Sequence, residues 1–340
     1  MNNKIIIDGF WRVGKTSVAK KLAQEFQYKI IKEPNHIDSN ININIDEWYV
    51  AKHQDRLKKL FQDRGARMIL ERSPLASAAF LYATHQKLQV VDRIVQEFML
   101  FYKRFRPLLV FMYADAQTIQ NAAKVVDDPK LKLLLTKKFF VKSYDFFYRN
   151  LLPFQYGVTP LCVNVSPQSP SAQFGDTINQ AKEAIIKAMQ ENRVAQINLI
   201  CYKMRKGEPL FLLLKRNSQK GGFWQGVTGG VKVGEILFDT LTRELREELS
   251  LKSKKEFLPS YFSFNYIGNE GYELNEYVFG CKLKWNEKII LSHEHTDYKL
   301  APLEQCLPML KYESNKKAIS LIHFLIKNGK RPKSFPKCNH

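Results

Sequence analysis

The chain has 340 residues, of which 45% are hydrophobic and 25% are charged, and this composition predicts a soluble globular protein with room for two domains. No apolar run approaches the ~20 residues of a membrane-spanning helix, and the first residues lack the apolar core of a signal peptide. The formal charge of +20 leaves two interpretations open, a nucleic-acid partner or a basic enzyme acting on small anions. Because the lysines are dispersed, the second interpretation is favoured, and no membrane partner is expected.

The cysteines predict neither a disulfide framework nor a zinc site. They are odd in number, widely spaced and without a CxxC pair: Cys162, Cys201, Cys281, Cys306 and Cys338. A reducing compartment, the cytoplasm, is therefore the expected location.

Up to about residue 190, short apolar runs alternate with amphipathic stretches. The runs predict strands at Lys4–Gly9, Tyr28–Lys32, Arg67–Leu70, Leu108–Tyr113 and Leu161–Val165. The amphipathic stretches predict helices at Thr16–Phe26, Ile45–Gln62, Val91–Phe105, Lys130–Asn150 and Thr177–Met189. This alternation predicts an α/β domain over residues 1–190, with a parallel sheet covered by helices on both faces.

The first predicted strand leads into a phosphate-binding loop. The stretch from Gly9 to Thr16, GFWRVGKT, fits the pattern G-x-x-x-x-G-K-[ST]. Glycines let backbone N–H groups surround a phosphate, Lys15 can reach the β- and γ-phosphate oxygens, and the Thr16 hydroxyl can meet Mg²⁺. We therefore predict a nucleoside-triphosphate site with ATP as phosphate donor, formed by Gly9, Gly14, Lys15, Thr16 and Ser17.

Two further charged motifs follow strands, at the sheet edge where open parallel sheets bind ligands. Lys32-Glu33-Pro34 ends the second predicted strand, and Glu71-Arg72-Ser73 ends the third. Each alone is compatible with a surface charge pair. Together with the loop they resemble the deoxynucleoside kinase and thymidylate kinase family over about 190 residues.

This resemblance implies three roles. Glu33 would be the carboxylate that faces the acceptor, Glu71 a magnesium ligand, and Arg72 a catalytic clamp on the reacting phosphates. A nucleoside acceptor needs a base to take the hydroxyl proton, whereas a monophosphate acceptor is already an anion. The motif E-R-S favours a nucleoside as the acceptor. Two alternative functions for this domain are kept: a thymidylate-type monophosphate kinase and a non-catalytic nucleotide sensor.

The lid segment departs from that family. Between Ala122 and Lys142, where arginines are expected to close on the phosphates, the cations are lysines: Lys124, Lys130, Lys132, Lys137 and Lys138. Lysine supplies charge without the planar fork of arginine, so no lid residue is assigned a catalytic role. Four aromatic residues could stack on a base, although core packing is expected for most of them: Trp48, Tyr49, Phe80 and Tyr82.

After residue 192 strand patterns dominate. Strands are predicted at Gln196–Lys203, Leu210–Lys215 and Glu276–Lys284, and helices at residues 236–249 and 315–327. The second domain is thus expected at residues 195–328. A basic tail, residues 329–340, follows it and leaves contact with nucleic acid open.

The strongest motif of the chain lies between Gly229 and Leu251. It reads G-x5-E-x7-R-E-L-x-E-E-x-S-L and resembles the Nudix box, with these residues in place: Gly229, Glu235, Arg243, Glu244, Glu247 and Glu248. A helix places Glu244, Glu247 and Glu248 on one face. Like charges that close disfavour a helix, and a divalent cation with oxygen ligands, Mg²⁺ or Mn²⁺, would offset their repulsion.

The resemblance implies an α/β/α fold with a mixed sheet. Flanking sequences, FWQGVTGG at 223–230, SHEHT at 292–296 and SNKKA at 314–318, resemble the branch that hydrolyses dATP or dihydroneopterin triphosphate to a monophosphate and pyrophosphate. Glu247 and Glu248 are then expected to be catalytic as well as metal ligands, and Glu235 and Arg243 are further candidates. Glu294 is a candidate ligand or general base, or else an ordinary loop carboxylate, whereas His293 and His295 are expected to be structural or surface residues.

One position departs from the box. Ser250 stands where the family has the glycine that ends the helix, and a left-handed conformation there costs serine about 1 kcal/mol. Because Ser250 is not a ligand, activity is expected to survive. The sequence as a whole predicts a bifunctional enzyme of small nucleosides and nucleotides; a homodimer is left open.

Overall fold

The computed structural model describes residues 3–33, 45–63, 65–84, 88–167, 174–268 and 271–329. The chain divides into two compact units. The N-terminal unit comprises Met1–Val194 with Lys232–Ile236 and Tyr266–Leu274, and the C-terminal unit comprises Ala195–Val231, Leu237–Asn265 and Asn275–His340. Pro34 and residues 330–340 of the predicted tail lie outside the described residues.

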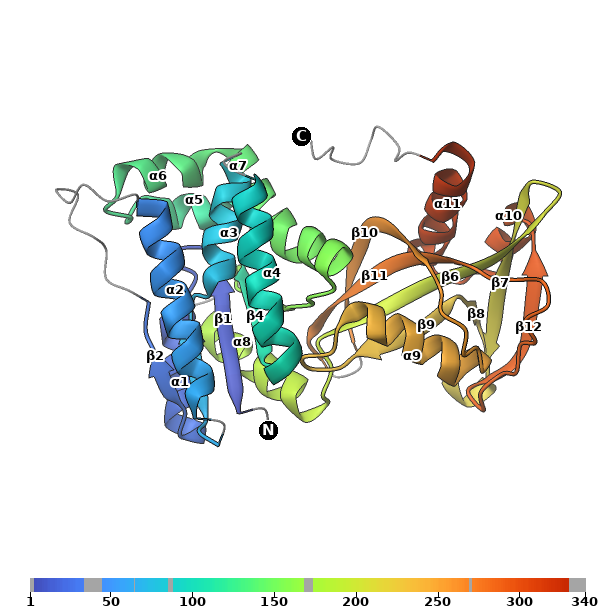
Figure 1. The fold of residues 1–340 in the computed structure, drawn as a ribbon, viewed down its shortest axis with the longest axis horizontal. Coiled ribbons are helices and arrows are strands. Elements are labelled where there is room, and N and C mark those ends of the chain that lie inside the picture. The colour runs from blue at the N-terminus through green and yellow to red at the C-terminus, as the bar shows by residue number, and fades with distance from the viewer. Residues whose placement is uncertain are drawn as a thin grey trace. The chain divides into compact units, whose positions relative to one another are not determined.

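The N-terminal unit is built on a parallel five-stranded sheet (Figure 1). Its strands are β1 (Lys4–Gly9), β2 (Lys29–Ile31), β3 (Met68–Glu71), β4 (Leu108–Tyr113) and β5 (Leu161–Asn164), in the order β2-β3-β1-β4-β5. Every residue of β1 and β4 is buried, as the continuous apolar runs of a sheet covered on both faces require. The predicted α/β class and parallel sheet are confirmed.

Helices follow the strands of this unit. They are α1 (Lys15–Phe26), α2 (Ile45–Gln62), α3 (Pro74–Ala83), α4 (Leu88–Phe105), α5 (Ala116–Ala123), α6 (Pro129–Thr136), α7 (Lys138–Phe146), the π-helix η1 (Phe147–Tyr156) and α8 (Phe174–Gln190). Helix α3 was not predicted because seven of its ten residues are buried, so its sequence lacks a polar stripe.

The prediction of one helix over Lys130–Asn150 is wrong. The chain becomes extended at Lys137, with φ −80° and ψ 112°, so α6 ends there and α7 begins at the next residue. Helix α7 then continues into η1, whose wider turns contain Pro153. The break occurs at a lysine and not at a proline or glycine, so the sequence carried no signal for the end of a helix there.

The C-terminal unit contains a mixed seven-stranded sheet. Its strands are β6 (Ala195–Arg205), β7 (Glu208–Arg216), β8 (Trp224–Gln225), β9 (Val227–Val231), β10 (Phe257–Ile267), β11 (Glu273–Lys282) and β12 (His295–Ala301). The main path runs β10-β11-β6-β7-β12, with β8 on β7 and β9 on β6. Strand β11 is parallel to β6, whereas β7 is antiparallel to β6 and β12, so the predicted mixed sheet is confirmed.

Helices cover this sheet (Figure 1). Helix α11 (Glu313–Asn328) packs on Ile200, Tyr202 and Phe211, together with the short α10 (Leu303–Cys306) and the 3₁₀ turn η3 (Leu307–Met309). Alternation turns Ile197 and Leu199 of β6 to the opposite face, where α9 (Leu237–Leu249) lies. A further 3₁₀ turn, η2 (Ser218–Lys220), precedes β8.

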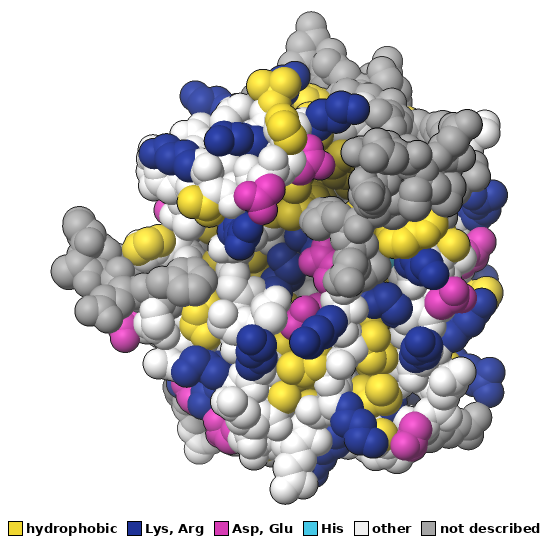
Figure 2. Space-filling view, turned by 90° about the vertical axis from the view of Figure 1, so that its left-hand side faces the viewer, with side chains coloured by type: hydrophobic (Ala, Val, Ile, Leu, Met, Phe, Trp, Pro, Cys, Tyr) yellow, Lys and Arg dark blue, Asp and Glu magenta, His cyan; other side chains and the backbone are white. Residues whose placement is uncertain are grey.

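Two surface properties bear on function. Figure 2 shows Lys and Arg side chains spread over one face with Asp and Glu among them, and not gathered in a stripe. None of the helices in the described part of the chain combines the length and apolarity needed to cross a membrane.

Candidate functional site

The predicted phosphate loop joins β1 to α1, and its two glycines have positive φ angles that favour glycine. Gly9 has φ +145°, and a Cβ there would lie 2.2 Å from the Met112 carbonyl oxygen. Gly14 has φ +85° and forms the N-cap of α1. Thr16 and Ser17 lie in the first turn of α1, so the predicted phosphate-binding residues are brought together at one helix N-terminus.

Lys15 points back into this loop. Its side chain is buried, and Nζ donates a hydrogen bond of 2.5 Å to the Phe10 carbonyl oxygen. Burial, aided by the nearby Arg72 cation, lowers the pKa of Lys15 to about 7. Burial thus outweighs the nearby carboxylates of Glu33, Asp8 and Glu71, and an incoming phosphate would favour the charged amine.

The predicted metal-side residues meet next to the loop. The Thr16 hydroxyl donates to Glu71 Oε2 at 3.4 Å, and burial raises the pKa of Glu71. Both groups offer oxygen atoms, the donors that Mg²⁺ prefers, so this pair fits the ion.

Asp8, which was not singled out from the sequence, braces this edge of the sheet. Its carboxylate is fully buried and accepts hydrogen bonds from the Ser73 backbone N–H (2.7 Å) and hydroxyl (2.6 Å). Burial raises the pKa of Asp8, although these hydrogen bonds oppose the rise. Asp8 thereby joins the end of β1 to the start of α3, beside the Glu71-Arg72-Ser73 motif.

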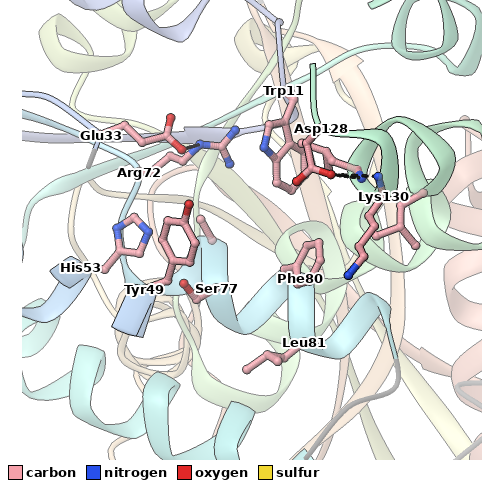
Figure 3. A pocket seen from close by; sticks show the side chains of 13 residues that line it. Trp11, Glu33, Tyr49, His53, Arg72, Ser77, Phe80, Leu81, Asp128 and Lys130 are labelled. Carbon is pink, nitrogen blue, oxygen red and sulfur yellow. Dashed lines mark hydrogen bonds and ion pairs between the residues drawn. The ribbon is translucent and has the colours of Figure 1, made fainter. Parts of the chain in front are cut away.

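A cavity of about 270 Å³ opens beside Glu33 and Arg72 (Figure 3). Its aromatic walls are Trp11, Tyr49 and Phe80, and its polar lining includes Asp128 and Lys130. In Figure 3 the Tyr49 hydroxyl points toward the Glu33–Arg72 pair. Of the four aromatic residues proposed for base stacking, Tyr49 and Phe80 line the cavity; Trp48 packs edge-on against Tyr49, and Tyr82 packs against Phe147.

Glu33 and Arg72 form an ion pair in the lining of this cavity. Arg72 Nε lies 2.7 Å from Glu33 Oε1, and the Trp11 ring covers the guanidinium at 4.4 Å. Burial alone would raise the pKa of Glu33, but the Arg72 and Lys15 cations outweigh it and hold that pKa below its usual value. Burial likewise acts to lower the pKa of Arg72, and the Glu33 charge raises it overall. Both side chains are therefore ionised at neutral pH.

Arg56 of α2 holds this pair in place and was missed by sequence reasoning. Its guanidinium donates to the backbone carbonyl oxygens of Ile31 (3.1 Å), Arg72 (3.1 Å) and Glu71. The carboxyl ends of β2 and β3 are thus tied together at the point where Glu33 and Arg72 emerge. Arg72 itself has φ +57°, an uncommon conformation that this contact helps to hold.

His53 completes the α2 side of the cavity. Its Nδ1 lies 3.0 Å from Arg56 Nη1, and burial, followed by the Arg56 and Arg72 charges, lowers its pKa to about 3. The imidazole is therefore neutral, and with Nδ1 facing the Arg56 donor it presents an acceptor there. The spacing of Tyr49, His53 and Arg56, four and three residues apart, was the signal that could have revealed this shared face.

The predicted lid is tied to the phosphate loop by Arg12. Its Nη2 donates to the Val125 carbonyl oxygen at 3.3 Å and lies 3.9 Å from Asp127. The segment after these residues supplies Asp128, Lys130, Leu131 and Leu134 to the cavity wall. A cation of the predicted phosphate loop therefore contacts the segment in which lysines replace the expected arginines.

In the C-terminal unit, α9 carries the three box glutamates. Glu244 and Glu248 are buried, whereas the Glu247 side chain is 48% exposed. Arg243 Nη1 contacts Glu244 and lies 3.0 Å from Glu247, and Nη2 donates to the Gly230 carbonyl oxygen at 2.8 Å. Burial raises the pKa of Glu244 to about 7, with Arg243 opposing and the Glu247 and Glu248 charges adding to the rise.

Gly229 makes room for Glu244. A Cβ on Gly229 would lie 1.9 Å from Glu244 Cδ, so only glycine fits where β9 passes α9. The buried carboxylate and its two neighbours carry more negative charge than Arg243 neutralises. This donor set fits a hard divalent cation, although within the described ranges no three His, Cys, Asp or Glu side chains already converge as a cage.

Glu248 is held by the segment before β12. Its Oε2 accepts from the Ser292 hydroxyl at 2.5 Å and lies 2.8 Å from His295 Nδ1. His295 is buried and touches Glu248, a predicted metal ligand, so it can help to orient that carboxylate. Glu294 lies beside Arg216 at 3.9 Å.

The remaining box residues have local roles. Glu235 Oε2 accepts from the Lys232 backbone N–H at 3.0 Å, in the turn that leads to α9. Ser250 has φ +56°, so the left-handed conformation expected after α9 is confirmed. The metal-binding and catalytic roles of the box residues stay predictions.

Comparison with known proteins found one family model that matches the chain. The NUDIX domain model matches residues 193–322, and no curated protein matches the chain. Similar solved structures include a Listeria monocytogenes protein assigned to the NUDIX hydrolases (25% identity, 40% of this chain, 97% of that chain, TM-score 0.37). Two others are the C. elegans Ap4A hydrolase (21%, 39%, 97%, 0.35) and the E. coli dihydroneopterin triphosphate pyrophosphohydrolase (22%, 38%, 94%, 0.34). Residues 193–322 of this chain are a NUDIX domain.

Proposed function

We propose that the C-terminal unit hydrolyses a nucleoside triphosphate or a related diphosphate compound to a monophosphate and pyrophosphate. The observation that carries this proposal is the Glu244 carboxylate, buried in the space that Gly229 leaves, with Glu247 and Glu248 on the same helix. Bound to these three carboxylates, Mg²⁺ or Mn²⁺ would supply positive charge for the diphosphate oxygens and lower the pKa of a water molecule.

The chain's own residues have separate tasks in this reaction. Glu244 and Glu248 would hold the cation from a buried position, and Ser292 and His295, which contact Glu248, would help to fix its orientation. Arg243 positions Glu247 and the turn at Gly230. Water adds to a phosphorus atom, the phosphoanhydride P–O bond breaks, the leaving phosphate keeps the electron pair, and the water proton passes to a carboxylate at the site.

The test compares Glu248→Gln with Glu256→Gln, an exposed glutamate of the same unit. Pyrophosphate and monophosphate release from a panel of nucleoside triphosphates is measured with Mg²⁺. We expect Glu248→Gln to lose at least about a hundredfold in kcat, and Glu256→Gln to match the unaltered protein. Equal activity in all three proteins would remove Glu248 from the reaction.

We propose that the N-terminal unit transfers the γ-phosphate of ATP to a nucleoside. The supporting observation is the aromatic cavity with two carboxylates, Glu33 and Asp128, and with the Arg72 charge already paired to Glu33. An uncharged acceptor suits this lining, because the Arg72 charge is paired with Glu33 and the Asp128 and Lys130 charges are of opposite sign.

In this transfer Glu33 would accept the proton of the attacking hydroxyl as its oxygen bonds to the γ-phosphorus and the β–γ bridge breaks. Arg72 would stabilise the negative charge on the phosphoryl group during transfer, and Thr16 with Glu71 would hold Mg²⁺. Lys15, with its lowered pKa, would regain a full charge against the phosphates.

Matched panels of deoxynucleosides and their monophosphates, with ATP and Mg²⁺ in a Glu248→Gln background, test the acceptor. Nucleoside phosphorylation lost in Glu33→Gln would support the proposal. Turnover of monophosphates alone would favour the thymidylate-type alternative. No turnover on either panel would leave the unit as a nucleotide sensor.

A further inference from the structure

Four side chains of the C-terminal unit form a cluster that the hydrolytic residues do not use. Arg216 ends β7, Phe223 precedes β8, and Lys311 and Tyr312 directly precede α11. The rings of Phe223 and Tyr312 meet edge to face, with centroids 5.3 Å apart and planes at 88°. We refer to these four residues as the cation–aromatic cluster.

Both cations of the cluster lie against the aromatic rings. The Arg216 guanidinium is 5.7 Å from the Phe223 centroid. Lys311 Nζ is 5.8 Å from the Phe223 centroid and 5.4 Å from that of Tyr312. The attraction between a cation and an aromatic ring contributes about 0.5–1 kcal/mol at exposed sites. This attraction helps to position the Arg216 and Lys311 side chains but does not neutralise their charge.

The positive charge of the cluster is poorly matched by nearby anions. The contact of Arg216 with Glu294 is long, at 3.9 Å. Its buried Nε finds no hydrogen-bond partner among the residues that the structure describes. Lys311 is exposed, and it enters no ion pair within the described ranges. A guanidinium and an ammonium left in this state are suited to an incoming anion with several oxygens.

The cluster is connected to the carboxylate site by one short segment. Ser292 and His295 contact Glu248, and Glu294 between them lies beside Arg216. Asn217, the residue after Arg216, donates to the carbonyl oxygens of His293 (3.2 Å) and Glu294 (2.9 Å). The same four-residue segment therefore contacts both a predicted metal ligand and the cluster's arginine.

Tyr312 adds a flat surface at this place. It is 45% exposed, although its ring already contacts Phe223 and Lys311. An exposed aromatic ring beside cations offers a face on which a nucleobase can stack, because every base has a π-face whatever its hydrogen-bonding edge.

We propose that the cation–aromatic cluster binds the nucleoside end of a nucleoside triphosphate, with the base on Tyr312 and phosphate oxygens at Arg216 and Lys311. This assignment rests on the proposed hydrolase function and narrows it. The substrate is a nucleotide recognised through its base plane and its polyphosphate charge; inorganic polyphosphate lacks the first of these features. The cluster residues position the substrate and take no part in the bond-breaking step.

The test separates base from phosphate recognition by comparing two substrates, a nucleoside triphosphate and inorganic tripolyphosphate. In Tyr312→Leu we expect KM for the nucleotide to rise about tenfold with kcat within about twofold, and KM for tripolyphosphate to stay unchanged. In Lys311→Gln we expect KM to rise for both substrates. Tyr312→Phe keeps the ring and should restore the nucleotide KM.

Tyr298→Leu is the matched control. Tyr298 is 42% exposed in β12 of the same unit, so its loss removes a similar exposed ring outside the cluster. Its KM values should equal those of the unaltered protein. A KM for the nucleotide that is unchanged in Tyr312→Leu, or that shifts equally with tripolyphosphate, would overturn the base assignment.

A binding measurement keeps this inference distinguishable from the hydrolase proposal. Equilibrium binding of the nucleoside triphosphate is measured in full-length protein carrying Lys15→Ala, which weakens the N-terminal nucleotide site, and Glu248→Gln. Weaker binding on adding Tyr312→Leu, together with no pyrophosphate release by the unaltered protein, would leave the cluster as a nucleotide site and sink the hydrolase. Unchanged binding would sink the cluster assignment whether or not hydrolysis occurs.

Discussion

The two units differ in how their buried carboxylates are neutralised. In the N-terminal unit Glu33 is paired with Arg72 at 2.7 Å, and Asp8 is saturated by Ser73. In the C-terminal unit one guanidinium, that of Arg243, stands against three glutamates, and the pKa of Glu244 rises to about 7 through burial. Glu33 of the first site is paired with a cation of its own unit, whereas the three box glutamates outnumber the one guanidinium beside them and fit an added divalent cation.

The largest effect should come from Gly229→Ala. Its Cβ would meet Glu244 Cδ at 1.9 Å, so the carboxylate must leave its place, and we expect hydrolysis to fall at least about a hundredfold. Overpacking should also cost about 1–3 kcal/mol of stability, measured by denaturant unfolding. Gly175→Ala, where nothing lies within 4 Å of the new Cβ, is the control. Normal hydrolysis in Gly229→Ala would show that Glu244 is not needed where the structure puts it.

Arg56→Gln should break the organisation of the N-terminal unit. Three backbone carbonyl oxygens lose a charged donor, so we expect about 2–3 kcal/mol of destabilisation and a fall in ATP-dependent phosphoryl transfer. Arg67→Gln, which removes a single exposed contact to the Phe26 carbonyl oxygen, should cost less than about 0.5 kcal/mol. Equal costs for the two variants would mean that Arg56 does not hold the strand ends.

Acid should affect the two sites differently. The Glu244 proton, held with a pKa of about 7, must leave before a cation binds, so the Mg²⁺ concentration for half-maximal hydrolysis should rise about tenfold per pH unit below 7. Glu33 has a lowered pKa, so the stability it contributes is present above the carboxyl's unfolded pKa and is lost as pH falls through the folded one. Protonation of Glu33 should therefore not limit kinase activity between pH 7 and 6. A Mg²⁺ requirement of hydrolysis that is flat across that range would contradict the burial of Glu244.

The smallest effect is expected at Ser250. Its φ of +56° suits glycine, so Ser250→Gly should raise the free energy of unfolding by up to about 1 kcal/mol. Hydrolysis should not change, because Ser250 contributes no ligand. A loss of activity would show that the end of α9 matters for the position of Glu248.

The sequence predicted those features that depend on the spacing of neighbouring residues along the chain. The spacing of Glu244, Glu247 and Glu248 indicated one helical face, and β1 and β4 were found at their predicted limits because their apolar runs are continuous. Partners far apart in the chain were missed. Glu248 meets His295, and Arg56 meets the carbonyl oxygens of Ile31 and Arg72, contacts that exist only once the sheet edges are assembled.

The remaining errors also have local causes. Trp11 was treated only as one of the variable positions of the predicted phosphate loop, although its ring covers the Arg72 guanidinium in the cavity. Strand β9 contains Gly229 and Gly230, which have low strand propensity, and its pairing with β6 holds these residues in the extended conformation. In both cases tertiary contacts decided the structure.

The central contrast is tested most directly by calorimetric titration of Mg²⁺ into the nucleotide-free full-length protein at pH 8. We predict binding that is lost in Glu244→Gln and retained in Glu71→Gln, because three box carboxylates share the single guanidinium of Arg243, whereas Glu71 accepts from Thr16 and lies near the Lys15 cation. Binding that survives Glu244→Gln and disappears in Glu71→Gln would contradict the account and place the cation-dependent site in the N-terminal unit.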